Sequence, residues 1–342
     1  MYKVKLKDIA ERSGVGIATV SAALNGTGRI SDDVRKKISD IAQDMNYYPN
    51  VAAKLLKAKH PSDIGMVICE LPNLVPGSGL FHGLLINFIQ DCDKENIKTH
   101  IEFMDPHGNL NQIPYFLYGG FAGGLIHAGV ILNSLREWVE IRKFPMVAID
   151  EPYTYSVWSK TGDGVFNAAQ YLAARGHRRI AYLGGPQKFG CHKLAFEGFE
   201  RAVQELPLDT DGGSLIHEFV QTGDCDTTHD GVEYTRQLIR REKCPTALIC
   251  NDMRLVYAAI HAITEAGLRI PEDISIIGGG AGWEAERIYP AVTCIERDLE
   301  TMISCSLNIL RRLMDGKKIY EPQIWVEPKL VQRSTCGVCR IK

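Results

Sequence analysis

Apolar residues recur three or four positions apart along the first sixty residues and predict three short helices there. The first helix ends at Gly14, because glycine readily adopts the positive φ of a sharp helix C-terminus. The third begins after Ser31, where two aspartates complement the positive end of the helix dipole. A short turn with a glycine between the first two helices is typical of a helix-turn-helix, whose second helix enters the major groove of DNA.

From residue 64 onward the pattern changes to alternating strands and helices. Ile64–Cys69 is a continuous apolar run, as expected of a strand buried on both faces. Further strands are predicted at Thr99–Phe103, Gly124–Ile126, Met146–Ile149, Ile180–Leu183, Ala247–Cys250 and Ile274–Ile277. Helices are predicted between them, at Leu84–Glu95, Trp138–Arg142, Val165–Arg175, Lys193–Glu205, Asp230–Arg241, Leu255–Ala266 and Leu299–Met314. This alternation predicts parallel sheets flanked by helices, an arrangement that a doubly wound enzyme would share.

Charge divides the 342-residue chain near the place where the pattern changes. The net charge is only -2, but residues 1–60 hold eleven basic and six acidic residues, which leaves 28 basic and 35 acidic residues in the remainder. A small basic segment joined to an acidic one indicates an anionic partner for the first segment alone.

The ten cysteines are scattered through a long chain, which indicates reduced thiols in a cytoplasmic protein. Cys336 and Cys339 form one CxxC, but no second pair accompanies them to complete a zinc site, and no metal or cofactor is expected. The charged N-terminal segment does not resemble a signal peptide, and no apolar stretch approaches the roughly 18 residues that span a membrane. A cytoplasmic location without membrane contact is therefore expected.

The first sixty residues carry a run of motifs in one continuous order. They are Leu6-Lys7-Asp8-Ile9-Ala10, Gly14-Val15, Thr19-Val20-Ser21, Leu24-Asn25, Ile30-Ser31, Val34-Arg35 and Tyr48-Pro49-Asn50, followed by Ala53 and Leu56. With these motifs the segment resembles the LacI/GalR family of bacterial transcriptional repressors. The resemblance implies a sequence-specific regulator that binds a palindromic DNA operator as a homodimer, associated with the bacterial nucleoid.

The resemblance implies roles for residues of the second helix and the loop after it. Thr19, Ser21 and Asn25 would bind phosphates and set the register of the protein on DNA. Arg29 would add a contact to the backbone or a groove edge. Base-reading positions hold Ile17, Ala18 and Ala22, which depart from the family's frequent polar residues. Such side chains can touch a thymine methyl but cannot make bidentate hydrogen bonds, so selectivity from DNA shape is expected.

A hinge helix is implied at about residues 50–58, with contacts from Asn50, Ala53, Lys54, Leu56 and Lys57. Two such helices of a dimer would lie in the minor groove, with Leu56 wedged between base pairs and the lysines near phosphates. The alternative for this segment is a packed linker helix.

The remainder of the chain matches the family's sensor domain at several motifs. They are Gly176-His177-Arg178-Arg179-Ile180, Asn251-Asp252, the run Gly267–Gly278, and Pro290-Ala291-Val292-Thr293. The resemblance implies a periplasmic-binding-protein-like domain over 61–342, after a DNA-binding domain over 1–60. It would have two α/β lobes joined by three crossovers, with a ligand cleft between them. The expected bounds are about 62–158 with 290–320 for lobe one, and 159–289 with 321–342 for lobe two.

The implied effector site departs from the family pattern. Gly280 stands where an Asp usually binds sugar hydroxyls, and Ala195 stands where an Arg usually does. Asn251 and Asp252 remain, and Trp283 could offer an aromatic face. The expected effector is a carbohydrate-related small molecule; a different ligand, or loss of the ligand, is the alternative.

No catalytic constellation is present. Gly278-Gly279-Gly280 lacks the spacing of a dinucleotide loop, and His177 is expected to order a turn rather than to catalyse. The chain is therefore not expected to be an enzyme. An intracellular sugar-binding protein without DNA function is the main alternative to a regulator.

Overall fold

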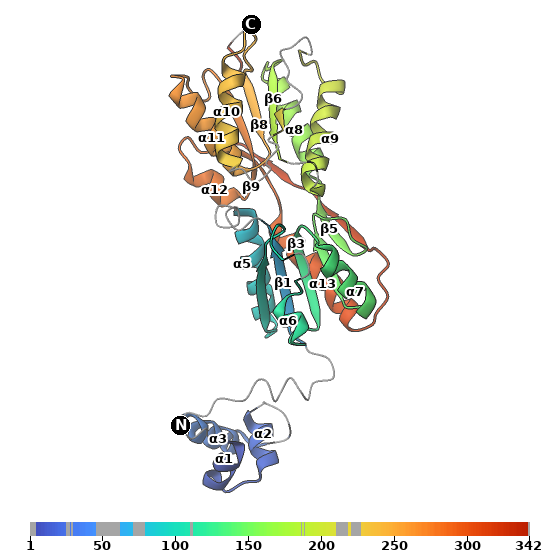
Figure 1. Ribbon diagram of the computed structural model, residues 1–342. Coiled ribbons are helices and arrows are strands. Elements are labelled where there is room, and N and C mark those ends of the chain that lie inside the picture. Colours follow the sequence, from blue (N-terminus) through green and yellow to red (C-terminus); the bar gives the residue numbers. More distant parts are fainter. Residues whose placement is uncertain are drawn as a thin grey trace. The chain divides into compact units, whose positions relative to one another are not determined.

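The computed structural model describes residues 5–24, 28, 30–45, 62–70, 79–109, 112–185, 187, 189–209, 218–219 and 227–340. The chain forms two compact units, Met1–Lys59 and His60–Lys342, which are termed the head and the body. The head consists of helices, whereas the body contains two sheets with helices packed on them (Figure 1). Each unit has hydrophobic cores of its own.

Within the described residues of the head, three helices lie in the places predicted: α1 (Leu6–Ser13), α2 (Ile17–Leu24) and α3 (Asp32–Asp44). Helix α1 begins with a hydrogen bond from the Lys5 backbone amide to Asp8 Oδ2 at 2.7 Å. It ends at Gly14, which has a φ of 75° and donates its amide to the Ala10 carbonyl at 3.0 Å. The predicted glycine stop is thereby confirmed.

The core of the head joins all three helices. Its buried residues are Ile9 and Ala10 of α1, Val20 and Ala23 of α2, and Ile38 and Ala42 of α3. Arg35 Nη1 donates to the Ala23 carbonyl at 3.0 Å, which satisfies an acceptor in the last turn of α2. These contacts hold one side of α2 against the other helices.

The first lobe of the body contains a six-stranded sheet in which the strand pairs are parallel. Its order is β11-β5-β4-β3-β1-β2. The strands are β1 (Ile64–Cys69), β2 (Thr99–Met104), β3 (Gly124–Gly129), β4 (Met146–Ile149), β5 (Ser156–Ser159) and β11 (Gln323–Val326). The helices described in this lobe are α5 (Gly79–Lys94), α6 (Tyr115–Tyr118), α7 (Asn133–Arg142) and α13 (Leu299–Met314).

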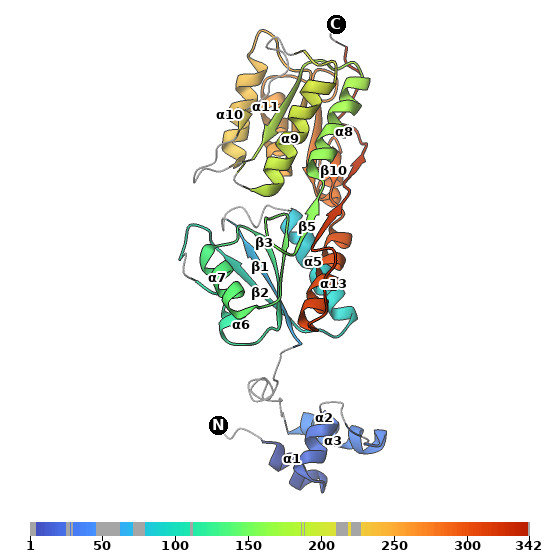
Figure 2. The same ribbon diagram turned by 90° about the vertical axis from the view of Figure 1, so that its right-hand side faces the viewer.

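The second lobe repeats the architecture of a sheet flanked by helices (Figure 2). Its strand order is β12-β10-β9-β8-β6-β7, in which β12 is antiparallel to β10. The strands are β6 (Ile180–Gly184), β7 (Glu218–Phe219), β8 (Ala247–Cys250), β9 (Ser275–Gly280), β10 (Thr293–Glu296) and β12 (Lys329–Val331). The helices are α8 (Thr161–Ala174), α9 (Gly190–Glu205), α10 (Thr227–Ile239), α11 (Met253–Glu265) and α12 (Gly282–Arg287).

Both faces of each sheet are covered by helices. In β1, Met66 and Ile68 pack with α5 and α13, whereas Val67 and Cys69 pack with α6 and α7. Alternate residues of a strand point to opposite faces, so a strand covered on both sides must be apolar throughout. In the second lobe, α8 and α9 cover one face, and α10, α11 and α12 cover the other. The predicted fold class is confirmed.

The chain passes between the two sheets at three places. Strand β5 leads into α8, β10 leads into α13, and β11 leads into β12. An ion pair between Lys160 and Glu327 joins the first and third of these crossovers. Strand pairing places β10 in the second sheet and β11 in the first, which differs from the expected assignment of 290–320 to lobe one and 321–342 to lobe two. Strands β10 and β11 have four residues each, and so short a sequence does not indicate with which sheet the strand pairs.

His177 lies buried in the turn before β6. Its Nδ1 lies 2.9 Å from Thr246 Oγ1, and its Nε2 lies 3.2 Å from both the Gly337 carbonyl oxygen and Ser275 Oγ. Burial lowers the pKa of the ring, which favours the neutral form. The ring therefore orders the turn and attaches the C-terminal segment to the second sheet.

The part of the chain that the structure describes contains neither a metal-binding cluster nor a membrane-spanning helix. Over the described residues, no group of three or more His, Cys, Asp and Glu side chains is arranged to hold a metal ion. Within the same ranges, none of the helices has the length and apolar character needed to cross a membrane.

Candidate functional site

Helix α2 presents a small apolar surface on the head. Val20 and Ala23 face the core, whereas Ile17 is 48% exposed and its neighbour Ala18 is also exposed. Ile17 is not among the residues that form the core of the head, so its side chain remains accessible at the surface.

Three further residues of α2 were predicted to contact DNA. Thr19, Ser21 and Ala22 are half-buried and flank the exposed pair on the helix. Residues four apart lie on the same side of a helix, so Ser21 lies one turn after Ile17 on one side, and Ala22 lies one turn after Ala18. The remaining predicted DNA contacts lie outside the described residues; they are Asn25, Arg29, Asn50, Ala53, Lys54, Leu56 and Lys57.

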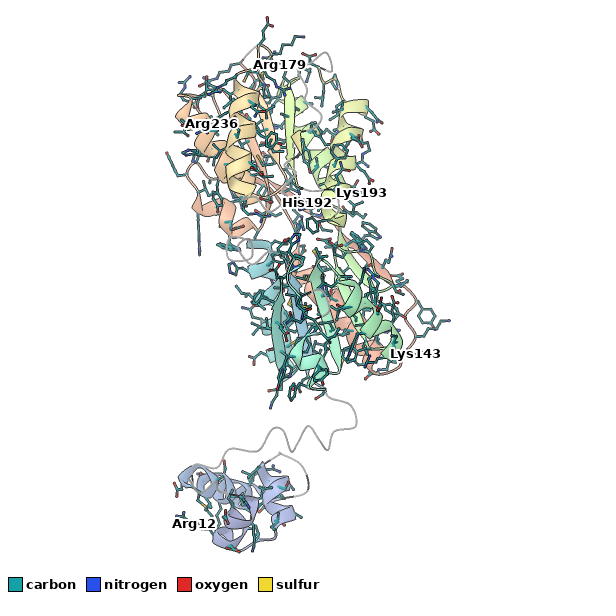
Figure 3. The ribbon with its side chains drawn as sticks, viewed as in Figure 1. Arg12, Lys143, Arg179, His192, Lys193 and Arg236 are labelled. Carbon is teal, nitrogen blue, oxygen red and sulfur yellow. The ribbon has the colours of Figure 1, made fainter. Side chains whose placement is uncertain are left out.

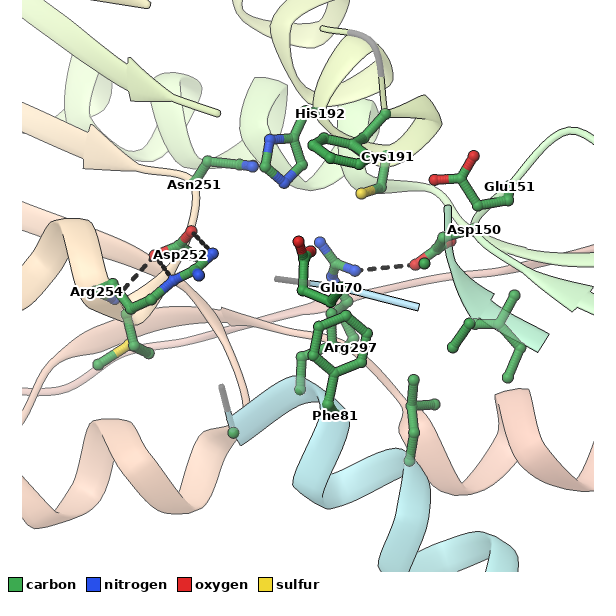
Figure 4. A pocket seen from close by; sticks show the side chains of 18 of the residues that line it. Glu70, Phe81, Asp150, Glu151, Cys191, His192, Asn251, Asp252, Arg254 and Arg297 are labelled. Carbon is green, nitrogen blue, oxygen red and sulfur yellow. Dashed lines mark hydrogen bonds and ion pairs between the residues drawn. The ribbon is translucent and has the colours of Figure 1, made fainter. Parts of the chain in front are cut away.

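The body contains a cleft lined by residues of both lobes, at the carboxyl ends of several strands (Figure 4). Ligands of parallel α/β sheets commonly bind at this edge. Polar and charged side chains follow the strands directly: Glu70 after β1, Asp150 and Glu151 after β4, Asn251 and Asp252 after β8, and Arg297 after β10. The same topology thus brings residues from distant parts of the sequence to one site.

Asp252 is the N-cap of helix α11. Its carboxylate accepts hydrogen bonds from the backbone amides of Arg254, at 2.8 Å, and Leu255, at 3.2 Å. It also pairs with the Arg254 guanidinium at 2.9 Å. Burial alone would raise the pKa of Asp252, but Arg254, His192 and the Leu255 amide outweigh burial, so the pKa lies below its ordinary value. The carboxylate is ionised and already engaged by its own lobe.

Arg297 and Asp150 form a buried ion pair in the cleft. Arg297 Nη1 lies 2.9 Å from Asp150 Oδ2, and both side chains are 8% exposed. Asp150 Oδ1 accepts the Ser159 backbone amide at 2.7 Å. Because Ser159 and Arg297 each adjoin a crossover, Asp150 connects two of the three crossovers. Burial raises the pKa of Asp150, and Arg297 and the Ser159 amide oppose that shift.

Glu151 lies beside Asp150 in the first lobe's wall of the cleft. Burial, followed by the nearby carboxylates of Asp150 and Glu70, raises the pKa of Glu151 to about 8. The Gly190 backbone amide and Arg136 act in the opposite direction but do not compensate. Glu151 is therefore mostly protonated at pH 7.

Asn251 and His192 contribute polar atoms from the second lobe. Asn251 is 6% exposed, and its Nδ2 has no hydrogen-bond partner among the described residues. His192 Nδ1 is likewise buried without such a partner, and burial lowers the pKa of this ring to about 4. Figure 3 places His192 where the two lobes meet, far from the outer-surface residues Lys143 and Arg236.

The predicted effector residues separate into two groups. Asn251 and Asp252 line the cleft, whereas Trp283, Gly280 and Ala195 are not among the lining residues. Trp283 is 42% exposed and lies beside Arg287, whose guanidinium carbon is 5.3 Å from the ring centroid. Gly280 packs against Met253, and Ala195 is fully buried in a core of the second lobe.

Sequence reasoning missed most of the charged lining. Glu70, Asp150 and Glu151 each follow a predicted apolar strand directly, and this position was a usable signal. Arg297 and His192 offered no such signal. Arg297 follows β10, which was not predicted, and His192 lies in the first turn of a helix.

Two family profiles match separate parts of this sequence. Residues 5–50 match "Bacterial regulatory proteins, lacI family", and residues 169–336 match "Periplasmic binding protein-like domain". The first match contains α1, α2 and α3, and the second contains most of the second lobe together with α13 and β11.

Curated relatives match the chain over most of its length. The HTH-type transcriptional repressor PurR of Actinobacillus pleuropneumoniae serotype 3 (strain JL03) is 28% identical over 338 residues, covering 96% of this chain and 97% of the relative. The probable HTH-type transcriptional repressor ExuR of Bacillus subtilis (strain 168) is 28% identical over 301 residues, 87% of each protein.

Solved structures share the fold. The Lac repressor dimer bound to operator and the anti-inducer ONPF superposes with a TM-score of 0.81 at 24% identity, covering 98% of this chain and 100% of that one. The transcriptional regulator CelR–cellobiose complex gives 0.70 at 20% identity, covering 97% and 100%. Together with the helix-turn-helix head and the two-lobed body, these findings show that the chain belongs to the LacI family, as a helix-turn-helix transcriptional regulator with a periplasmic-binding-protein-like sensor domain.

Proposed function

We propose that this repressor binds a palindromic operator as a homodimer and that a small molecule in the cleft modulates its affinity for the operator. As a LacI-family regulator it is not an enzyme, and it acts through binding. The observation that carries the proposal is the presence, in one chain, of an exposed apolar surface on α2 and a cleft with buried polar side chains.

Helix α2 would read the major groove with small apolar side chains. Ile17 and Ala18 can touch thymine methyl groups, and neither can form the bidentate hydrogen bonds that identify guanine or adenine. Thr19, Ser21 and Asn25 would bind phosphates and fix the register. We therefore expect half-sites that contain thymine, with further selectivity from the shape and deformability of the duplex.

The segment after the head would form the hinge helices of the dimer. Leu56 would wedge between base pairs in the minor groove, and Lys54 and Lys57 would lie near phosphates. Ligand binding in the cleft would change the closure of the lobes and, through the dimer, the stability of these helices. Such coupling requires only that the ligand bind the two conformations with different affinity.

The cleft supports a retained effector rather than a lost one. A buried amide donor such as Asn251 Nδ2 costs free energy when it has no hydrogen-bond partner, and a ligand oxygen would supply that partner. The ligand is proposed to be carbohydrate-related and to act in a bacterial cytoplasm. The relatives are differently named repressors, PurR and ExuR, so they do not identify the ligand.

Selection of random duplexes by the full-length protein tests the operator proposal. We expect enrichment of a palindrome with two short half-sites, confirmed by titrations of that duplex at two salt concentrations. Weak, salt-sensitive binding without sequence preference would contradict the proposal, because phosphate contacts alone produce that behaviour.

A matched pair of variants tests the wedge at the hinge. Leu56→Ala should weaken binding to the selected duplex and reduce its bending, whereas the neighbouring Leu55→Ala should leave both nearly unchanged. Equal effects of the two substitutions would favour a packed linker helix instead.

A further inference from the structure

The ion pair between Arg297 and Asp150 connects the two lobes beside a crossover. Arg297 directly follows β10 and leads into α13, where the chain passes from the second sheet to the first. Two lobes joined by crossovers move about those segments, so residues beside a crossover stay near both lobes. This ion pair can therefore persist when the cleft opens.

A second contact joins the lobes at a different place. The backbone amide of Gly79, in α5 of the first lobe, donates to Glu284 Oε1, in α12 of the second lobe, at 3.1 Å. Both residues line the cleft; Gly79 is buried and Glu284 is 7% exposed. In Figure 1, α12 and the start of α5 lie on the left of the body, whereas β5, which leads into a crossover, lies on the right. A contact away from the crossovers must break when the lobes separate.

Gly79 allows an unusually close approach of the Glu284 carboxyl group. A Cβ atom at position 79 would lie 2.0 Å from Glu284 Oε2 and 2.1 Å from its Cδ, so a side chain there would displace the carboxyl group. Gly79 is the first residue of α5 (Gly79–Lys94), and the amides of a first helical turn have no partner within the helix. A carboxylate at this end accepts such an amide and complements the helix dipole.

The charge of Glu284 depends on this contact. Burial raises the pKa of Glu284, and the Gly79 amide opposes that shift because it stabilises the ionised form. The hydrogen bond thus favours a carboxylate inside the cleft, and a charge-assisted hydrogen bond is stronger than a neutral one. Separation of the lobes would remove the donor that Glu284 has in this structure.

We propose that Glu284 is a latch, whose hydrogen bond to Gly79 holds the lobes together and must break before the cleft opens to admit a ligand. The apparent affinity of any ligand is then reduced in proportion to the fraction of molecules that are open. The latch is a property of the body and does not depend on the operator proposed above.

The reactivity of Cys191 measures opening of the cleft. Cys191 lines the cleft, and Figure 4 shows its thiol directed into it. Burial raises the pKa of this thiol to about 12, so alkylation is slow while the lobes are together. Cys244 packs instead against a core of the second lobe and reports general loosening. The rate of alkylation of each thiol by N-ethylmaleimide is measured in the full-length protein by peptide mass spectrometry.

Two substitutions remove the latch from opposite lobes. Glu284→Ala deletes the acceptor, and Gly79→Ala places a Cβ where the carboxyl group lies. Each should accelerate alkylation of Cys191 about fivefold, as expected for the loss of one helix-capping hydrogen bond, without changing the rate at Cys244. The combined variant should react no faster than either single variant, because both remove the same contact.

The alanine at position 79 also separates a latch from a local cap of α5. Alanine favours a helix more than glycine does, so Gly79→Ala should not loosen α5 itself. A role of Glu284 confined to the end of α5 therefore predicts no acceleration at Cys191 in this variant. Glu284→Gln retains an acceptor oxygen and should give a smaller acceleration than Glu284→Ala.

Glu286→Gln is the matched control on the same short helix. Glu286 is exposed and pairs with Arg333, which follows β12 of the second sheet, so this variant should change neither rate. An unchanged rate at Cys191 in either alanine variant, additive effects in the combined variant, or equal acceleration at Cys191 and Cys244 would overturn the latch. The operator proposal fails separately, when duplex selection yields no palindrome whatever the alkylation rates are.

Discussion

Asp252 and Glu151 face the same cleft from opposite lobes, and their carboxyl groups have pKa values shifted in opposite directions. Each residue lies in the loop that follows a parallel strand, β8 for Asp252 and β4 for Glu151. Asp252 caps α11 and pairs with Arg254, and its pKa is lowered. Glu151 lies beside two other carboxylates, and its pKa is raised to about 8. The neighbouring charged groups and hydrogen-bond donors, rather than the position in the fold, therefore determine whether each carboxyl group is ionised.

Asp252 and its cationic partner both belong to the second lobe, whereas the two residues of the buried ion pair Asp150–Arg297 come from different sheets. Asp150 belongs to the first lobe, but its guanidinium partner Arg297 arrives from the end of β10, at a crossover. Stability and ligand binding should therefore respond differently to substitutions on the two walls. All four tryptophans lie in the body, so their fluorescence during urea unfolding reports this unit alone.

The largest effect is expected from Arg297→Met. This substitution leaves Asp150 buried without its cation, which should lower the free energy of unfolding by about 3–5 kcal/mol. The added change Asp150→Asn should recover part of the loss, because no buried charge then remains. A loss well below about 1 kcal/mol for Arg297→Met would show that Asp150 is satisfied by the Ser159 amide alone.

Stability should also depend on pH through Glu151. The folded state holds the Glu151 proton up to a pKa of about 8, whereas the unfolded chain loses it near the ordinary value of 4.5. The folded state thus binds more protons between these values, so the free energy of unfolding falls as pH rises, by at most about 1.4 kcal/mol per pH unit.

The variant Glu151→Gln isolates this contribution. It should flatten the decline in stability between about pH 5 and pH 8 and should be more stable than the wild type at the upper end. An unchanged slope in urea unfolding measured across this range would indicate that Glu151 titrates as an ordinary carboxylic acid.

A smaller loss is expected on the opposite wall. Asp252→Ala removes the cap of α11 and should lower the free energy of unfolding by about 1 kcal/mol. Asp252→Asn keeps an oxygen that can accept from the Leu255 amide and should cost less. If both variants lose the same amount, the ion pair with Arg254 outweighs the cap.

The smallest effect is expected from Trp283→Ala. Trp283 is partly exposed and does not line the cleft, so its loss should change the stability of the body by no more than about 0.5 kcal/mol. Effector affinity should be unchanged as well. A clear loss of affinity would indicate that Trp283 contacts the effector, as the sequence analysis predicted.

The sequence was sufficient for the elements with strong periodicity. The three head helices, and strands such as Ile64–Cys69 and Ala247–Cys250, lie where apolar patterns predicted them. Elements without such a pattern were not predicted. Strand β5 has the sequence Ser-Val-Trp-Ser, and the edge strand β11 is partly exposed, so neither forms an apolar run. Pairing with a neighbouring strand, rather than local composition, makes these segments extended.

The site was predictable only in part, for a related reason. Asn251 and Asp252 were predicted because they belong to a recognisable motif, and both line the cleft. Gly280 and Ala195 were selected by alignment with family positions, and here they pack against protein atoms instead. The ion pair between Asp150 and Arg297 joins residues 147 positions apart, and no local pattern reports such a contact.

The first lobe is built from two separate parts of the sequence, because α13 and β11 follow the second lobe's strands β6 to β10. This arrangement has a consequence during synthesis. Helix α13 supplies Leu299, Met302, Ile303, Leu307 and Leu310 to a core that β1 and α5 begin, and β11 completes the sheet only at Val326. Until the ribosome has delivered nearly the whole chain, the part of this apolar face that α13 covers, over β3, β4 and β5, has no cover. A premature stop at any codon between those for Ser159 and Leu299 should therefore yield an aggregating fragment rather than a stable half-molecule.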